Sequence, residues 1–160
     1  MATTKKTIEV EVPVRTAYDQ WTQFEEFPRF MDGVESVKQL DDKRLHWRAT
    51  VGGKLKEWDA EITEQRPDEI IAWRSTSGAR NAGTVTFEPA DKGTKVTLML
   101  DYEPQGAAEK TGGALGVLDR QVSSDLDRFK KFIEERRTPT GEWRGTIEGG
   151  RVEEPGKTMR

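Results

Sequence analysis

Hydrophobic and polar positions change their period twice along the first part of the chain. Alternation over residues 8–12 predicts a first strand with one buried face. Over residues 14–31, apolar side chains recur at intervals of three and four, which predicts two short helices with a hinge near Thr22 or Pro28. The chain therefore opens with a strand followed by two helices.

After Gly33 the period returns to two for roughly seventy residues, as in an antiparallel meander. The predicted strands are 34–40, 44–51, 55–65, 69–75, 82–89 and 94–103, with turn-forming residues between them. Gly52-Gly53 is typical of a two-residue hairpin loop. One strand face is apolar and the other carries charged and hydroxyl side chains, which predicts a sheet covered on one side only.

The cover is predicted to be a long amphipathic helix over about residues 113–137. Seven strands spaced about 4.8 Å apart span roughly 29 Å, whereas one helix is only about 10–12 Å across. A flat sheet could not be covered by this helix, so we expect the sheet to curl around it. The fold class is then α+β, with helices packed on one face of a curved antiparallel sheet.

A polar segment follows Thr138, with little hydrophobic periodicity. We divide the chain into a domain, residues 1–137, and a C-terminal tail, residues 138–160. Trp143 and Ile147 are exceptions in this tail, because a disordered segment gains little from an exposed indole. Disorder, docking on the domain and oligomerisation through a second subunit all remain open.

A family resemblance is carried by the runs Pro13-Val14-Arg15-Thr16-Ala17-Tyr18-Asp19-Gln20-Trp21 and Phe24-Glu25-Glu26-Phe27-Pro28-Arg29-Phe30-Met31-Asp32-Gly33-Val34. They resemble the opening of the START-like (SRPBCC) superfamily, in its polyketide cyclase/dehydrase and coenzyme Q-binding branch. The resemblance extends in element order over about residues 5–137. It implies a helix-grip fold, in which a curved seven-stranded sheet grips a long helix around a hydrophobic cavity. Members bind lipids, sterols, polyketides or quinones, and some catalyse aromatic cyclisation and dehydration.

Composition excludes several classes of site. The chain has no cysteine and a single histidine, His46, so we expect no metal site, and the alternation places His46 on the solvated face. The net charge of −3 comes from interspersed charges, which argues against a nucleic-acid partner. No apolar run is long enough to span a membrane, and we expect a cytoplasmic protein without a permanent cofactor.

Tryptophans on the inward strand face are the main candidates for a ligand site, because an indole suits a cavity wall that touches a planar, partly polar ligand. The residues predicted to line the cavity are Trp47, Trp58, Trp73, Phe87, Leu100, Tyr102, Leu118 and Val122. Ordinary core packing is the alternative for these aromatic residues. Polar groups that could reach the same space are Tyr18, Ser75, Tyr102 and Gln121.

Three functions follow as hypotheses. The first is binding or carriage of a small hydrophobic molecule that is lipid-, quinone- or polyketide-like. The second is catalysis, as a polyketide aromatase/cyclase or dehydratase, although no recognisable acid–base pair occurs and catalytic residues cannot be assigned. The third is a structural or stress-associated interaction protein that acts through its surface and through Trp143. The residues favour a binding protein over an enzyme.

Overall fold

The computed structural model describes residues 2–51, 54–102 and 113–154. Its strands are β1 (Ala2–Val10), β2 (Val34–Gln39), β3 (Arg44–Val51), β4 (Lys54–Arg66), β5 (Ile70–Gly78), β6 (Asn81–Ala90), β7 (Gly93–Tyr102), β8 (Thr146–Glu148) and β9 (Arg151–Glu153). The helices are α1 (Val14–Trp21), the 3-10 helix η1 (Phe24–Arg29) and α3 (Gly113–Arg136). None of the described helices is long and apolar enough to cross a membrane.

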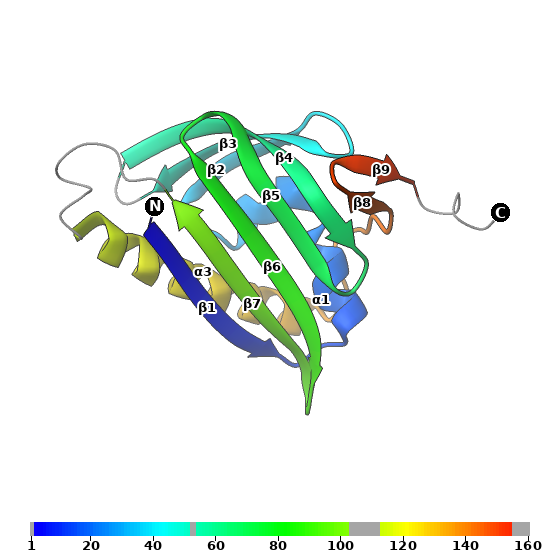
Figure 1. Cartoon of the computed structure of the whole chain (residues 1–160). Coiled ribbons are helices and arrows are strands. Elements are labelled where there is room, and N and C mark those ends of the chain that lie inside the picture. Colours follow the sequence, from blue (N-terminus) through cyan, green and yellow to red (C-terminus); the bar gives the residue numbers. More distant parts are fainter. Residues whose placement is uncertain (1, 52–53, 103–112, 155–160) are drawn as a thin grey trace.

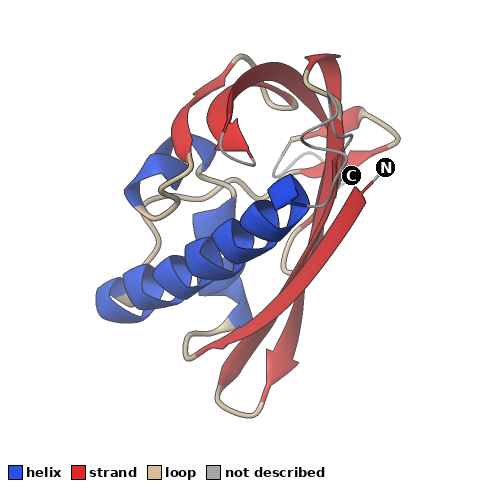
Figure 2. Cartoon of the chain, turned by 90° about the vertical axis from the view of Figure 1, so that its left-hand side faces the viewer, coloured by secondary structure: helices blue, strands red, loops and turns tan. Residues whose placement is uncertain are grey.

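Seven strands form an antiparallel sheet in the order β1-β7-β6-β5-β4-β3-β2, and β8 joins the same sheet by pairing with β4 and with β9 (Figure 1). This is the predicted curved sheet of an α+β helix-grip fold. Register shifts between β2 and β3 and two more between β4 and β5 mark bulges, which bend strands and increase their twist. The sheet therefore curls, and α3 lies across its concave side (Figure 2).

The strands differ from the sequence prediction in one boundary and in two additional strands. β1 begins at Ala2 rather than near Ile8, because its polar first half pairs with β7 from Ala2↔Tyr102 onward. β8 and β9 add two strands that were not predicted. The Gly52-Gly53 loop and residues 103–112, which include the last residue of the predicted strand 94–103, lie outside the described residues.

The core lies between the concave sheet face and the helices. Trp21 of α1 packs edge-on against Phe129 of α3 at 4.9 Å between ring centroids. Phe30 also contacts Phe129, at 5.4 Å. Phe129 and Ile133 are fully buried, so the C-terminal half of α3 is packed solidly against α1 and η1.

Residues 138–154 pack on the rest of the molecule. Ile147 of β8 is fully buried and pairs with Gln65 of β4, beyond the point where β3 stops pairing with that strand. Trp143 packs against the hydrophobic core. Ile147 and Trp143, the two apolar exceptions in this segment, therefore both contact the rest of the chain.

Candidate functional site

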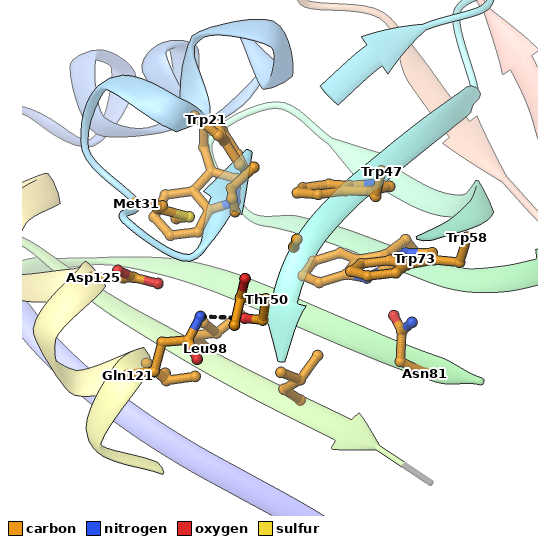
Figure 3. A pocket seen from close by; sticks show the side chains of 15 residues that line it. Trp21, Met31, Trp47, Thr50, Trp58, Trp73, Asn81, Leu98, Gln121 and Asp125 are labelled. Carbon is orange, nitrogen blue, oxygen red and sulfur yellow. Dashed lines mark hydrogen bonds between the residues drawn. The ribbon is translucent and has the colours of Figure 1, made fainter. Parts of the chain in front are cut away.

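A half-open cavity of about 110 Å³ lies between the concave sheet and the N-terminal half of α3 (Figure 3). Four tryptophans line it, one from α1 and three from adjacent strands: Trp21, Trp47, Trp58 and Trp73. The rest of the lining is mostly aliphatic and aromatic, namely Phe27, Met31, Val34, Ala49, Leu98, Leu100 and Val122. The polar members are Thr50, Asn81, Gln121 and Asp125.

Strand register explains how the indoles are positioned. Trp47 of β3 is the direct cross-strand neighbour of Trp58 of β4, and their rings stack with an interplanar angle of 6° and 5.9 Å between centroids. Trp73 of β5 lies opposite Gly83 of β6. A Cβ atom at Gly83 would come within 2.2 Å of the Trp73 ring, so this glycine provides the space for the third indole. The three indoles form one wall of the cavity.

Gln121 connects α3 to the sheet at the edge of the cavity. Its amide nitrogen donates a hydrogen bond of 2.7 Å to the Thr50 carbonyl oxygen (Figure 3). The amide occupies the space next to Gly33, where a Cβ would lie 1.7 Å from Nε2. The Thr50 N–H in turn donates to the Gly33 carbonyl oxygen at 2.7 Å. These three residues link α3, the start of β2 and the end of β3.

Asp125 supplies a carboxyl group to the cavity and is only 8% exposed. Burial raises the pKa of Asp125 to about 6, against the opposing effects of the Arg128 charge and a backbone hydrogen bond from Asp32. Arg128 Nη1 lies 3.3 Å from Asp125 Oδ1, and its Nη2 forms an ion pair of 2.9 Å with Asp32. A carboxyl with this pKa can donate or accept a proton near neutral pH.

The structure brings five of the eight predicted cavity residues together: Trp47, Trp58, Trp73, Leu100 and Val122 line the cavity. Phe87 lies elsewhere, packed edge-on against Tyr18 and Trp21. Tyr102 is buried at the end of β7, opposite Ala2 and Asn81. Leu118 belongs to α3, and its side chain is outside the described residues.

Of the four predicted polar candidates, only one lines the cavity. Gln121 lines the cavity, whereas the Tyr18 hydroxyl accepts a hydrogen bond from Gln65 at 3.0 Å and is buried away from it. Burial raises the pKa of Tyr18 above its usual range. Ser75 accepts a hydrogen bond of 3.1 Å from the Asn81 backbone N–H. Tyr18 and Ser75 therefore have structural hydrogen bonds rather than a place at the site.

His46 lies on the outer sheet face, as predicted, and its ring nitrogens contact Asp59 at 2.6 Å and Glu57 at 3.0 Å. The hydrogen bond to Asp59, followed by that to Glu57, raises the pKa of His46. Within the described residues, no group of three or more histidine, aspartate or glutamate side chains is arranged to hold a metal ion.

Sequence reasoning did not predict nine of the lining residues: the apolar Trp21, Phe27, Met31, Val34, Ala49 and Leu98, and the polar Thr50, Asn81 and Asp125. A charged residue is not expected on the apolar face of an amphipathic helix, so Asp125 was not among the predicted cavity residues. Its position three residues after Val122 and four before Phe129 places it on the apolar stripe, and this was a usable signal. Asn81 precedes the predicted strand, so no periodicity indicated where it faces.

Comparison with known proteins agrees with this geometry. Residues 10–131 match the family model described as polyketide cyclase / dehydrase and lipid transport. An uncharacterised 17.2-kDa protein of Streptomyces lincolnensis is 54% identical over 149 residues, which cover 92% of this chain and 99% of that protein. That span exceeds 137 residues, so the match includes part of segment 138–160.

Solved structures share the fold. A Deinococcus radiodurans protein superposes with a TM-score of 0.68 at 30% identity, over 85% of this chain and 99% of that one. The aromatase/cyclase ZhuI of Streptomyces sp. R1128 superposes with a TM-score of 0.70 at 16% identity, over 84% of this chain and 94% of that one. The chain therefore belongs to the polyketide cyclase/dehydrase and lipid transport family, within the START-like superfamily.

Proposed function

We propose that this protein binds a small hydrophobic molecule in the cavity between α3 and the curled sheet. The observation that carries the proposal is the lining, which consists of four tryptophans and mostly aliphatic side chains, with only four polar residues. Each 100 Å² of apolar ligand surface removed from water contributes about 2.5 kcal/mol, from which the cost of immobilising the ligand is subtracted. Membership of a family named for lipid transport supports the same class of ligand.

The size of the cavity limits what it encloses. Its volume of about 110 Å³ is well below the roughly 300–1,000 Å³ of pockets that enclose drug-sized molecules. It is closer to an engineered cavity of about 150 Å³ that binds benzene. The enclosed part of the ligand is therefore about one ring or an equivalent short chain, and any longer part would lie at the open side.

Filling the cavity tests this proposal. Ala49→Leu extends a buried lining residue into the space, so it should weaken binding of small aromatic and lipid-like probes at least tenfold, as measured by calorimetric titration. Ala72→Leu is the matched control, because Ala72 pairs with Glu64 and Thr84 on the other sheet face. Equal affinity in both variants, or no binding of any such probe by the native protein, would refute the proposal.

A second candidate function is favoured by Asp125. A carboxyl group with a pKa of about 6 that lines the cavity could transfer a proton to or from a bound polyketide-like substrate during cyclisation or dehydration. The similarity in fold to an aromatase/cyclase makes this reaction class the natural alternative.

Separate measurements of binding and turnover distinguish the two functions. If the protein is an enzyme, Asp125→Asn should retain ligand binding and lose product formation by about 10²–10⁴-fold, the range typical of a general acid or base. Retention of product formation in Asp125→Asn would exclude this role for Asp125. Binding without any turnover by the native protein would leave the carrier function alone.

A further inference from the structure

Asp125 gives the cavity a negative group without a positive counterpart in the lining. Among the described residues that line the cavity there is no lysine, arginine or histidine, although the chain contains 26 lysine and arginine residues. Figure 3 shows Asp125 on the side of α3, with the indoles of Trp58 and Trp73 across the cavity from it. The described lining therefore combines a carboxyl group on one side with an aromatic wall on the other.

The partners of Asp125 within the protein neutralise only part of its charge. Arg128 Nη1 lies 3.3 Å from Asp125 Oδ1, but Nη2 of the same guanidinium forms a shorter ion pair, of 2.9 Å, with Asp32. The Asp32 backbone N–H also donates a hydrogen bond to the Asp125 carboxyl. Among the described residues, Arg128 and Asp32 are the charged groups that act on Asp125, so two carboxylates share one guanidinium. A carboxylate has about four acceptor positions, and Asp125 therefore keeps some of them for a ligand.

A ligand that fills the cavity changes the surroundings of this carboxylate. It displaces water from Asp125, and a buried charge is costly unless it is paired and hydrogen-bonded. A hydrocarbon group supplies neither a charge nor a donor, and a carboxylate on the ligand adds repulsion. A hydroxyl can donate a hydrogen bond but brings no positive charge. A protonated amine supplies both, and its charge is also attracted by aromatic rings.

We propose that the ligand enclosed by this cavity is a protonated hydrophobic amine, whose ammonium group pairs with Asp125 while its apolar part lies against the indoles of β3, β4 and β5. This inference rests on the proposed ligand-binding function and adds the chemical class of the ligand. It also separates this cavity from one that binds fatty acids or other acidic lipids, because such a site needs a positive group to receive the carboxylate.

Three probes with one ring and a short side chain separate the contributions: 2-phenylethylamine, 2-phenylethanol and phenylacetate. The first is a cation at neutral pH, the second is neutral and the third is an anion. Calorimetric titration of the native protein at pH 7.5 should give an affinity for the amine at least tenfold higher than for the alcohol, because hydrogen bonds to charged groups are the stronger ones. Phenylacetate should bind most weakly of the three.

The pH dependence of binding has a definite sign. The amine binds the ionised form of Asp125, and a pKa of about 6 leaves only about one-tenth of this group ionised at pH 5. The amine itself stays protonated throughout this range, so its affinity should rise about tenfold between pH 5 and pH 7.5. The affinity for the alcohol should stay level or fall over the same interval, because a neutral ligand favours the protonated carboxyl.

Two variants locate the effect. Asp125→Asn has nearly the same shape without the charge, so it should lower the affinity for the amine at least tenfold and abolish its pH dependence, while the affinity for the alcohol changes little. Asp127→Asn is the matched control, because it removes the same charge from an exposed position on the same helix. This control should leave the affinity for the amine within about twofold of the native value.

The possible results separate the inference from the function on which it depends. Binding of the alcohol or of phenylacetate as tightly as the amine at pH 7.5 overturns the amine inference and leaves the ligand-binding function standing. An affinity for the amine that Asp125→Asn leaves unchanged, or lowers no more than Asp127→Asn does, has the same consequence. Failure of the native protein to bind any of the three probes also overturns the amine inference. Binding of longer lipid-like probes in that case would still support the broader function.

Discussion

Single residues determine the polarity and the access of this cavity, and Asp125 is the clearest example. Its carboxyl lies on the apolar stripe of α3, and burial raises its pKa to about 6. A carboxyl in an unfolded chain titrates near 3.9. The folded protein therefore holds the Asp125 proton more tightly than the unfolded chain does, and its stability depends on pH through this group.

The stability that protonated Asp125 contributes is complete below about pH 4 and is lost as the pH rises through about 6, on the order of 3 kcal/mol for two pKa units. Asp125→Asn cannot ionise, so its stability relative to the native protein should increase between pH 4 and pH 7. Urea unfolding of both proteins at several pH values measures this, and parallel stability curves would contradict it.

Gly33 leaves room for the Gln121 amide because it has no side chain. A methyl group there would overlap the Gln121 amide, so Gly33→Ala should break the hydrogen bond from Gln121 to Thr50 at a cost of about 0.5–1.5 kcal/mol. Gln121→Ala removes the same link. Stopped-flow measurements should show faster ligand release in each single variant and no further increase in the double variant, because both changes act on one contact. Additive effects would show that Gly33 and Gln121 act separately.

At the scale of elements, segment 138–154 provides hydrogen-bond and ion-pair partners for buried polar side chains of α1. Asp19 and Gln20 are at most 2% exposed. Gln20 exchanges two hydrogen bonds with Thr140, at 3.0 and 2.8 Å. Asp19 forms a close ion pair with Arg144, whose guanidinium also lies 5.5 Å from the centre of the Tyr18 ring. The segment therefore completes the environment of the helix that carries Trp21 into the cavity.

Arg144→Met tests this role. The change leaves the Asp19 carboxylate buried, with Arg15 at 3.6 Å as its remaining cationic partner among the described residues, and should lower the free energy of unfolding by about 3 kcal/mol at neutral pH. Burial already raises the pKa of Asp19, so the loss should shrink in acid as this carboxyl becomes protonated. Arg151→Met, at an exposed site in the same segment, is the control for chemical denaturation. Equal stability of both variants would show that the segment is dispensable.

The sequence predicted helices and strands well where the pattern of buried and exposed positions extends over several residues. Alternation placed Trp47, Trp58 and Trp73 on the inward face, and strand register then made them neighbours. β8 escaped prediction because a three-residue strand is too short to show a period. The alternation placed Phe87 correctly on the inward face of the sheet. Its side chain nevertheless packs against Tyr18 and Trp21 of α1 and does not line the cavity. Which inward side chains border a void depends on three-dimensional packing.

For the whole molecule, the curled sheet and the single long helix fit closely at one end and incompletely at the other. The C-terminal half of α3 is packed on Trp21 and Phe30, whereas the cavity lies beside its N-terminal half. This asymmetry is what gives a small chain, rich in charged residues, an apolar site lined by indoles.

The indole N–H resonances provide the most direct test of ligand binding in the cavity. Trp21, Trp47, Trp58 and Trp73 line the cavity, whereas Trp143 packs elsewhere and serves as an internal reference. In a ¹H–¹⁵N NMR titration with phenol, we expect resonances of the cavity tryptophans to shift saturably with one common dissociation constant while Trp143 stays unchanged. Cavity resonances that do not respond, or a Trp143 response as large as theirs, would contradict ligand binding at this site.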